Sequence, residues 1–373
     1  MIENNWYTLD DPDQTDSPAL LIYPWRIRQN IGEMIRIAGS PQRLMPHIKT
    51  HKMSAVVKMQ LEAGIRRFKC ATIAEAEMLA ATGAKEVLLA YQLSAPKALR
   101  FMKLIREYPE VDFSSLVDNT GSVAMLNDLF AGDGTTASVF IDVDNGMHRT
   151  GFPAGDTLAD FYKKVAAFPF IHCRGLHVYD GHIREKDFKK RRAATEAAFA
   201  PVTRAVKAIR EAGLSRPEVI AGGSPTFPVH ALNPEVICSP GTSLLWDKGY
   251  GDLLAEQPFL QAAVLLTRVL SKPQDGNLTT DLGHKSVAAE NPIDQRVFFL
   301  NMENYEVISQ SEEHLGLKID QALWKEIKVG DVLYGIPYHI CPTVALYDEV
   351  EVVENGHVTG RWKVEARTKK ISV

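Results

Sequence analysis

The sequence contains few cysteines, little net charge and no long apolar stretch. Its four cysteines, Cys70, Cys173, Cys238 and Cys341, lack paired spacing in a chain of 373 residues, which indicates reduced thiols and not a disulfide framework. A formal net charge of −4, with both signs interspersed, provides no basic face for nucleic acid and no polybasic tail for a lipid surface. No apolar stretch is long enough to span a bilayer, and residues 1–16 are polar and acidic. We therefore expect a cytoplasmic protein that binds neither nucleic acid nor membranes.

Strand-like and helix-like segments alternate regularly through the first two thirds of the chain. A hydrophobic content of 45% allows a large buried core. Eight consecutive βα units predict an α/β fold, a TIM-like (β/α)8 barrel whose functional residues lie at the C-terminal strand ends. The expected barrel strands cover residues 44–48, 67–71, 86–91, 114–117, 138–143, 173–179, 219–221 and 236–238.

The pattern of predicted secondary structure changes after the Gly/Pro-rich connection at residues 241–258. Short strands and turns follow, with Asn355-Gly356 as a hairpin signal, and they predict a mostly β C-terminal domain. We expect residues 1–25 to be an N-terminal segment that packs with the β domain, residues 26–255 to form the barrel, and residues 256–373 to form the β domain. Its expected strands cover residues 263–270, 278–281, 297–302, 305–309, 332–336, 345–353 and 358–364.

The segment Pro46–Lys52 places Lys49 at the C-terminal edge of the first barrel strand. A lysine among other cations and partly shielded from water can lose its proton near neutrality, which Schiff-base chemistry requires. A solvated loop with several basic residues is the alternative interpretation.

Two glycine-bearing turns follow the last two barrel strands, one with Gly222, Gly223 and Ser224 and the other with Gly241 and Thr242. Loops after strands seven and eight are the usual phosphate-binding position in this fold, although ordinary barrel turns could have the same composition. A phosphate site together with an imine-forming lysine suggests pyridoxal phosphate.

Three further residues lie where they could contact such a cofactor. Arg149 follows the fifth strand and could pair with a phenolate or a carboxylate, or be only a surface cation. His177 and Tyr179 are two residues apart at the end of the sixth strand, so their side chains point the same way. This fits a ring stacked on pyridoxal with a polar neighbour, whereas a purely structural histidine is the alternative.

The segment Pro337–Thr343 contains the candidate metal ligands His339 and Cys341. If the segment is extended, both side chains share one face and can bind one ion, with zinc favoured by an imidazole and a thiolate. Two protein ligands leave open positions for a substrate hydroxyl. The alternative is a strand end with no ion.

Together these residues resemble the group of D-threonine aldolases and D-serine dehydratases, fold-type III enzymes that share their barrel with the alanine racemases. The resemblance runs from about Ser17 to the C-terminus, and its motifs agree in order and spacing. The matching segments are Pro46–Lys52 for the cofactor lysine, Gly146–Gly151 for the arginine near the phenolic oxygen, Gly222–Ser224 and Pro240–Thr242 for the phosphate loops, and His339–Cys341 for the metal pair of the dehydratases.

The resemblance implies a homodimer that uses pyridoxal phosphate on Lys49 and a divalent metal, zinc, manganese or magnesium, and that acts on a D-β-hydroxy amino acid. Ser239 stands where racemases carry an arginine, which disfavours racemisation. The His-x-Cys pair resembles the dehydratases, whereas Ser271–Pro273 and Gly283–Ser286 resemble the aldolases. We expect an aldolase that releases glycine and an aldehyde, with a D-serine or D-threo-3-hydroxyaspartate dehydratase, a racemase and a non-catalytic cofactor-binding protein as alternatives.

Overall fold

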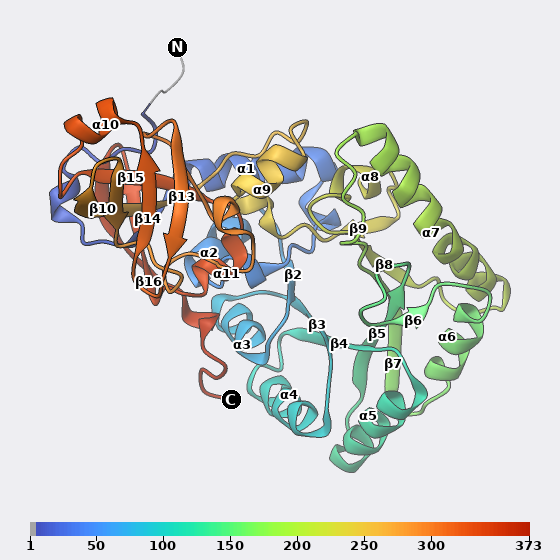
Figure 1. Ribbon diagram of the computed structural model, residues 1–373. Helices are drawn as coiled ribbons and strands as arrows, with labels where there is room; N and C mark the ends of the chain where they lie inside the picture. Colours follow the sequence, from blue (N-terminus) through green and yellow to red (C-terminus); the bar gives the residue numbers. More distant parts are fainter. Residues whose placement is uncertain (1–4) are drawn as a thin grey trace. The chain divides into compact units, whose positions relative to one another are not determined.

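The computed structural model describes residues 5–373, and the chain separates into two compact units (Figure 1). Each unit is assembled from segments that are not continuous in sequence. The domain boundaries expected at residues 25 and 255 stay a prediction, because each of these units combines separate parts of the sequence. The β unit takes residues up to 31, 50–55 and 242–367, and the barrel unit takes residues 32–49, 56–241 and 368–373.

The barrel unit confirms the expected parallel barrel. Seven strands are hydrogen-bonded in the order β2-β3-β4-β5-β7-β8-β9, and all neighbouring pairs are parallel. Figure 1 shows α3 to α7 outside these strands. The strands are β2 (Arg67–Cys70), β3 (Glu86–Gln92), β4 (Asp112–Val117), β5 (Ala137–Asp144), β7 (Ile171–Val178), β8 (Glu218–Ala221) and β9 (Val236–Cys238), with the short β6 (Phe152–Pro153) paired to β5.

The first expected strand closes the barrel through two single bridges. Leu44 pairs with Cys238 of β9 and His47 pairs with Lys69 of β2, both in parallel. The extended ladder is shorter than predicted because Pro46 has no N–H to donate and Ile48–Thr50 turns into a 3-10 helix. Lys49 lies in that turn.

The helices of the barrel unit begin and end at residues that satisfy their free backbone groups. In α3 (Ile73–Thr82), the Thr72 side chain accepts a hydrogen bond from Glu75 N, and Gly83 ends the helix at φ +102°. The other helices are α1 (Pro24–Ala38), α2 (Ser54–Glu62), α4 (Ala95–Glu107), α5 (Thr120–Asp133), α6 (Leu158–Ala166), α7 (Phe188–Glu211) and α8 (Phe227–His230); α1 and α2 each cross from one unit to the other.

A layer of buried apolar side chains fills the barrel. It consists of Met45, Leu88, Leu116, Phe140 and Ile220, each at most 2% exposed. Each comes from a different strand segment, as expected when alternate residues of parallel strands point inward. This layer separates the two ends of the barrel.

A network of ion pairs closes the N-terminal end of the barrel. Arg67 contacts Glu86 and Glu218, both at 2.6 Å. Arg174 contacts Glu86 at 2.8 Å, Asp112 at 2.7 Å and Glu218 at 2.8 Å. Burial raises the pKa of Glu218 and the charge of Arg67 lowers it, and the lowering dominates. Each of the five side chains therefore has at least one ion-pair partner in this network.

The β unit contains a nine-stranded sheet, which confirms the expected β-rich part. Its main order is β13-β14-β11-β10-β1-β16-β17, with β15 paired to β10 and β12. Strand β1 is antiparallel to β10 and parallel to β16, so the N-terminal segment is part of this sheet. The strands are β1 (Ala19–Ile22), β10 (Ala263–Gln274), β11 (Asn277–Thr280), β12 (Val297–Phe299), β13 (Tyr305–Gln310), β14 (Leu315–Ile319), β15 (Val332–Pro337), β16 (Glu349–Glu354) and β17 (His357–Lys363).

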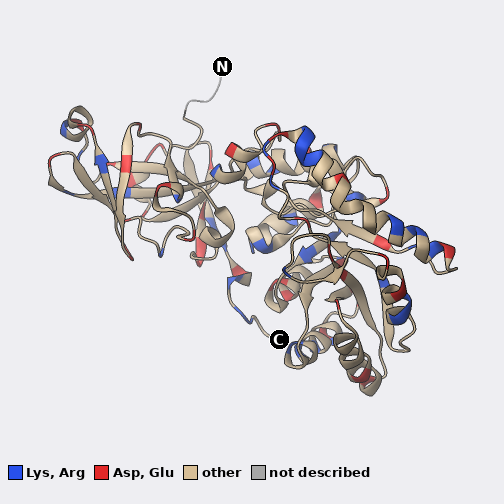
Figure 2. Cartoon of the chain, turned by 45° about the vertical axis from the view of Figure 1, so that its right-hand side comes forward, with Lys and Arg blue, Asp and Glu red and all other residues tan. Residues whose placement is uncertain are grey.

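Two parts of the β unit differ from the sequence-based expectation. Strand β14 was not expected, and the strand expected from residue 345 begins only at Glu349. Three short helices lie in this unit, α9 (Lys248–Leu253), α10 (Gln321–Glu326) and α11 (Ile340–Val344). None of the helices within residues 5–373 combines the length and the apolar character needed to cross a bilayer. Figure 2 shows both signs of charge on the elements of each unit.

Candidate active site

A small cavity of about 40 Å³ at the C-terminal ends of the barrel strands brings four predicted residues together. Lys49, Arg149, His177 and Tyr179 all line it. Around the centroid of the Tyr179 ring, Lys49 Nζ lies at 5.8 Å and Arg149 Cζ at 4.9 Å. Because these residues come from three separate strand ends, the barrel and not local sequence creates the pocket.

Lys49 is held by contacts of the segment that precedes it. His47 N donates to Pro240 O at 2.8 Å, and Lys49 N donates to His47 Nδ1 at 3.2 Å. The bridge between His47 and Lys69 anchors the same segment on β2. The turn therefore leaves the strand register at His47 and presents Lys49 to the pocket.

His177 is buried at the end of β7 and bonded to a carboxylate. Its Nδ1 lies 2.7 Å from Asp142 Oδ1, and Asp142 Oδ2 accepts from Thr150 Oγ1 and Gln92 Nε2, both at 2.8 Å. Burial raises the pKa of Asp142, but the hydrogen bonds from His177, Thr150 and Gln92 lower it to about 2. Burial, followed by the charge of Lys69, lowers the pKa of His177. The arrangement is therefore an ionised Asp142 with a neutral His177 that carries its proton on Nδ1.

Sequence reasoning missed a second lysine in this pocket. Lys69 of β2 lines the cavity and is 2% exposed, and its Nζ lies 3.3 Å from His177 Nε2. Burial and the nearby charge of Lys49 lower the pKa of Lys69 to about 7. The available signal was a lysine between Phe68 and Cys70, which are both buried, in a strand of the barrel.

The two glycine loops meet at the C-terminal strand ends. Gly241 N donates to Ser224 Oγ at 3.3 Å. Gly222 has φ +83°, and a Cβ there would lie 2.7 Å from His230 Cδ2. A Cβ on Gly223 would lie 2.9 Å from Tyr179 Cε2. Both positions therefore favour glycine, because a side chain there would meet His230 or Tyr179.

A buried network supports the first of these loops. Asp180 Oδ1 accepts from Thr226 Oγ1 and Asp180 Oδ2 lies next to His230 Nε2, both at 2.6 Å. Gly223 N in turn donates to Thr226 Oγ1 at 3.3 Å. The remaining predicted loop residue, Thr242, belongs to the β unit.

The candidate metal ligands lie in the β unit, but the segment that carries them is not extended. Strand β15 ends at Pro337, and His339 is the N-cap of α11, so the expectation that a strand places His339 and Cys341 on one face is wrong. The turn nevertheless brings the two side chains into hydrogen-bond contact. Cys341 Sγ also lies 3.2 Å from Thr50 Oγ1 and 3.6 Å from Thr242 Oγ1.

A carboxylate orients the imidazole of His339. Its Nδ1 lies 2.5 Å from Glu290 Oε1. Burial lowers the pKa of His339, but the interactions with Cys341 and Glu290 raise it to about 9. Histidine ligands of metals commonly donate their second ring N–H to a carboxylate in this way. Within residues 5–373, no group of three or more His, Cys, Asp or Glu side chains is arranged to hold a metal.

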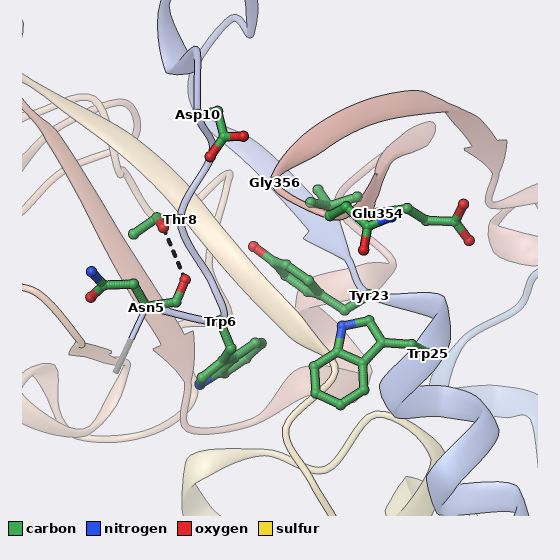
Figure 3. A pocket seen from close by; sticks show the side chains of 10 residues that line it. Asn5, Trp6, Thr8, Asp10, Tyr23, Trp25, Glu354 and Gly356 are labelled. Atoms are coloured by element: carbon green, nitrogen blue, oxygen red, sulfur yellow. Dashed lines mark hydrogen bonds between the residues drawn. The ribbon is translucent and has the colours of Figure 1, made fainter. Parts of the chain in front are cut away.

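A second, larger cavity of about 550 Å³ lies in the β unit (Figure 3). Trp6, Tyr23 and Trp25 provide aromatic walls, and the Arg26 guanidinium carbon lies 3.6 Å from the centroid of the Trp6 ring and 4.9 Å from that of Trp25. Two of these aromatic faces already contact a cation of the chain itself. The cavity contains none of the residues predicted to carry chemistry.

Fold and pocket together define an α/β-barrel protein with a lysine-bearing site at the carboxyl ends of its strands. The chain belongs to the family of the alanine racemase N-terminal domain, whose model matches residues 22–247. A model described as a putative serine dehydratase domain matches residues 262–353. The family resemblance expected from the motifs is thereby confirmed.

Several relatives match nearly the whole length of the chain. The chain is 27% identical to 3-hydroxy-D-aspartate aldolase from Paracoccus denitrificans (strain Pd 1222), over 96% of this chain and 94% of the relative. Two solved structures share its fold. The crystal structure of D-threonine aldolase from Filomicrobium marinum has a TM-score of 0.86 and 24% identity, covering 95% of this chain and 96% of that one. The structure of D-threo-3-hydroxyaspartate dehydratase from Delftia sp. HT23 has a TM-score of 0.82 and 23% identity, covering 94% and 97%.

Proposed function

We propose that this protein is a lyase that uses pyridoxal phosphate and a divalent metal to cleave D-β-hydroxy amino acids, as D-threonine aldolases do, to glycine and an aldehyde. The observation that carries the proposal is the barrel pocket, where Lys49 lies with Arg149, His177 and Tyr179 at the strand ends. The names of the whole-length relatives, an aldolase of 3-hydroxy-D-aspartate and an aldolase of D-threonine, support the substrate class.

The residues of the barrel unit fit pyridoxal phosphate. Gly222 and Gly223 keep the loop after β8 without side chains, which suits the close approach of a phosphate to its backbone. Ser239 is 2% exposed, and its Oγ has no hydrogen-bond partner within the described residues. That hydroxyl is available for the ring nitrogen. Ser224 and Gly241 complete the phosphate side, and Lys49 is the attachment point.

Bound pyridoxal phosphate supplies an electron sink for the pair released when a bond at the substrate Cα breaks. In this proposal Lys49 Nζ takes a proton from the substrate and returns one to Cα. His177 presents its ring to the cofactor, held in one tautomer by Asp142. Arg149, whose guanidinium is always charged, binds an anionic oxygen, and the Tyr179 ring lies beside Arg149 and Lys49.

The donor set of His339 and Cys341 fits a divalent cation with two protein ligands. Glu290 binds His339 Nδ1 and so leaves Nε2 for a metal. An imidazole and a thiolate favour zinc, with manganese and magnesium as the other candidates. A divalent cation held there supplies a Lewis acid for the β-oxygen of the substrate.

Dehydration is the second candidate, because the chain carries a thiol at Cys341, as the resembling dehydratases do, and Cys341 contacts His339. In that outcome the β-hydroxyl leaves and ammonia and a 2-oxo acid result. Ser239 disfavours a racemase, and the β unit with its His-x-Cys pair disfavours a non-catalytic protein. We also propose a cytoplasmic homodimer.

Product analysis tests the proposal. The protein, loaded with pyridoxal phosphate and zinc or manganese, is incubated with D-threonine, D-serine and D-3-hydroxyaspartate, and glycine and ammonia are measured. Glycine with an aldehyde supports the aldolase. Ammonia with a 2-oxo acid would replace it by the dehydratase, and neither product from any substrate would contradict lyase activity.

A further inference from the structure

The barrel pocket contains a buried cation to which neither the motifs nor the resemblance gives a role. Lys69 Nζ lies 3.3 Å from His177 Nε2, its one hydrogen-bond partner among the described residues. An ammonium carries three N–H donors, so two remain for a ligand. Burying such a group, here 2% exposed, without an opposite charge is strongly unfavourable.

The chain's own carboxylate does not satisfy Lys69. Asp142 uses Oδ1 for His177 Nδ1 and Oδ2 for Thr150 and Gln92. His177 therefore carries its proton on Nδ1 and accepts from Lys69 with Nε2, as a neutral ring. The hydrogen bond positions the ammonium but supplies no negative charge to it.

Two further cations of the pocket add positive charge near Lys69. Lys49 Nζ and Lys69 Nζ each lie 5.8 Å from the centroid of the Tyr179 ring, and Arg149 Cζ lies 4.9 Å from it. Burial, Lys49 and Arg149 lower the pKa of Lys69 to about 7, and the charges of Asp142 and Asp180 offset only part of this effect. An anionic oxygen in this space would reverse that effect, because an opposite charge favours the ammonium.

We propose that Lys69, together with Arg149, forms a subsite for an anionic oxygen of the bound ligand, with Lys69 as its buried donor. The inference rests on the proposed function, because that function defines the ligand. The oxygen comes from one of two sources, the phenolate of pyridoxal phosphate or the second carboxylate of an acidic β-hydroxy amino acid. Both accept charge-assisted hydrogen bonds from an ammonium.

The first arm of the test examines the cofactor. Apoprotein is titrated with pyridoxal phosphate and with 3-deoxypyridoxal phosphate, which lacks the phenolic oxygen, and dissociation constants are read from the visible absorption. If Lys69 binds the phenolate, Lys69→Met weakens pyridoxal phosphate binding on the order of tenfold to hundredfold. Binding of the 3-deoxy compound then stays within about twofold of the wild type.

The second arm examines the substrate. Holoprotein is titrated with D-3-hydroxyaspartate and D-threonine, and binding is followed by the change in the visible spectrum, without reference to turnover. If Lys69 binds the substrate carboxylate, Lys69→Met weakens D-3-hydroxyaspartate binding on the order of tenfold to hundredfold. Both cofactors and D-threonine then bind as in the wild type.

Control variants separate charge in the pocket from charge elsewhere. Lys58→Met removes an exposed lysine of α2 and leaves all four constants unchanged. Lys69→Gln keeps a donor without the charge and is measured beside Lys69→Met, so that poor folding of one variant does not decide the result. Lys69→Arg restores part of the lost affinity.

Two results would overturn the inference in distinguishable ways. A wild-type protein that binds no pyridoxal phosphate would remove the proposed function and the inference together. A wild type that binds it normally, with folded Lys69→Met and Lys69→Gln proteins that match its four constants within about twofold, would remove the inference alone.

Discussion

The two ends of the barrel contain similar charged residues in opposite states of pairing. At the N-terminal end, Arg67 and Arg174 contact carboxylates at 2.6–2.8 Å, and every member of the network has a partner. At the C-terminal end, Lys49, Lys69 and Arg149 make no ion pair within the described part of the chain, and the nearby Asp142 is bonded to neutral groups.

This difference separates residues that stabilise the fold from residues kept for a ligand. Paired charges need no further partner, so the charged groups of the N-terminal end are not available to bind a ligand. Three cations and one carboxylate, Asp142, line one pocket, and its excess of positive charge becomes favourable when an anion binds. Variants at the C-terminal end should therefore change activity, and variants at the N-terminal end should change stability.

Replacement of Lys49 gives the largest expected effect. Lys49→Ala removes the amine that holds the cofactor and moves the proton, so kcat should fall by about 10³-fold or more and the visible absorption band of the holoprotein should disappear. Steady-state kinetics and absorbance spectra measure both. Lys58→Ala, which removes an exposed lysine, is the matched control. A Lys49→Ala protein that keeps the band would disprove the cofactor assignment.

Removal of the metal or its histidine ligand should cost somewhat less. Chelation with EDTA, or His339→Ala, should lower kcat/KM by about 10²-fold, because the Lewis acid for the β-oxygen is lost. Zinc or manganese should restore the chelated wild type, and metal analysis should show reduced content in the variant. His357→Ala removes an exposed histidine of the same unit and should retain full activity. Undiminished activity after thorough chelation would exclude a metal from the mechanism.

Arg174→Met should affect stability and leave chemistry intact. The arginine is 11% exposed and contacts three carboxylates. Its loss leaves Glu86 and Glu218 with Arg67 alone and removes the contact of Asp112, which should cost about 2–3 kcal/mol. Chemical denaturation measures this cost, and kcat/KM should change less than about twofold. Arg36→Met, which breaks an exposed pair with Glu33, should cost less than about 0.5 kcal/mol. Equal losses in both variants would refute the difference between the two ends.

Local sequence signals predicted most of the pocket. Lys49, Arg149, His177 and Tyr179 each lie at or just after the end of a recognisable strand. The rule that parallel strands carry function at their C-terminal ends predicts that they meet. Lys69 could not be found this way, because its contact with His177 joins residues 108 positions apart. The role of a lysine inside a strand can be inferred only when its partner on another strand is known.

The β unit was harder to predict, since its geometry depends on turns and distant pairs. His339 and Cys341 were identified, but the end of β15 at Pro337 and the start of α11 decide how they meet. Glu290, 49 positions away, could not be connected with His339 from sequence. Strand β14 was missed because Gly316 weakens its strand signal, whereas in the fold a Cβ there would lie 2.3 Å from Ser309 Oγ.

The smallest expected effect concerns the pH dependence of stability at the C-terminal end. The pKa of Lys69 is lowered to about 7 in the folded apoprotein and returns to its ordinary value, near 10.5, on unfolding. Between these values the unfolded chain binds more protons than the folded one, so this residue makes the free energy of unfolding rise with pH. Its contribution is at most about 1.4 kcal/mol per pH unit.

Denaturation of wild-type and Lys69→Met apoprotein at pH 7, 8 and 9 measures that contribution as a difference in slope. The wild type should gain stability relative to the variant as the pH rises, because Lys69 becomes neutral and its burial is no longer opposed. Lys58→Met should keep the wild-type slope. Equal slopes for wild type and Lys69→Met would mean that Lys69 stays charged in the empty pocket. The charge of Lys69 would then be tolerated without a ligand. The contrast with the fully paired charges of the N-terminal end would be lost.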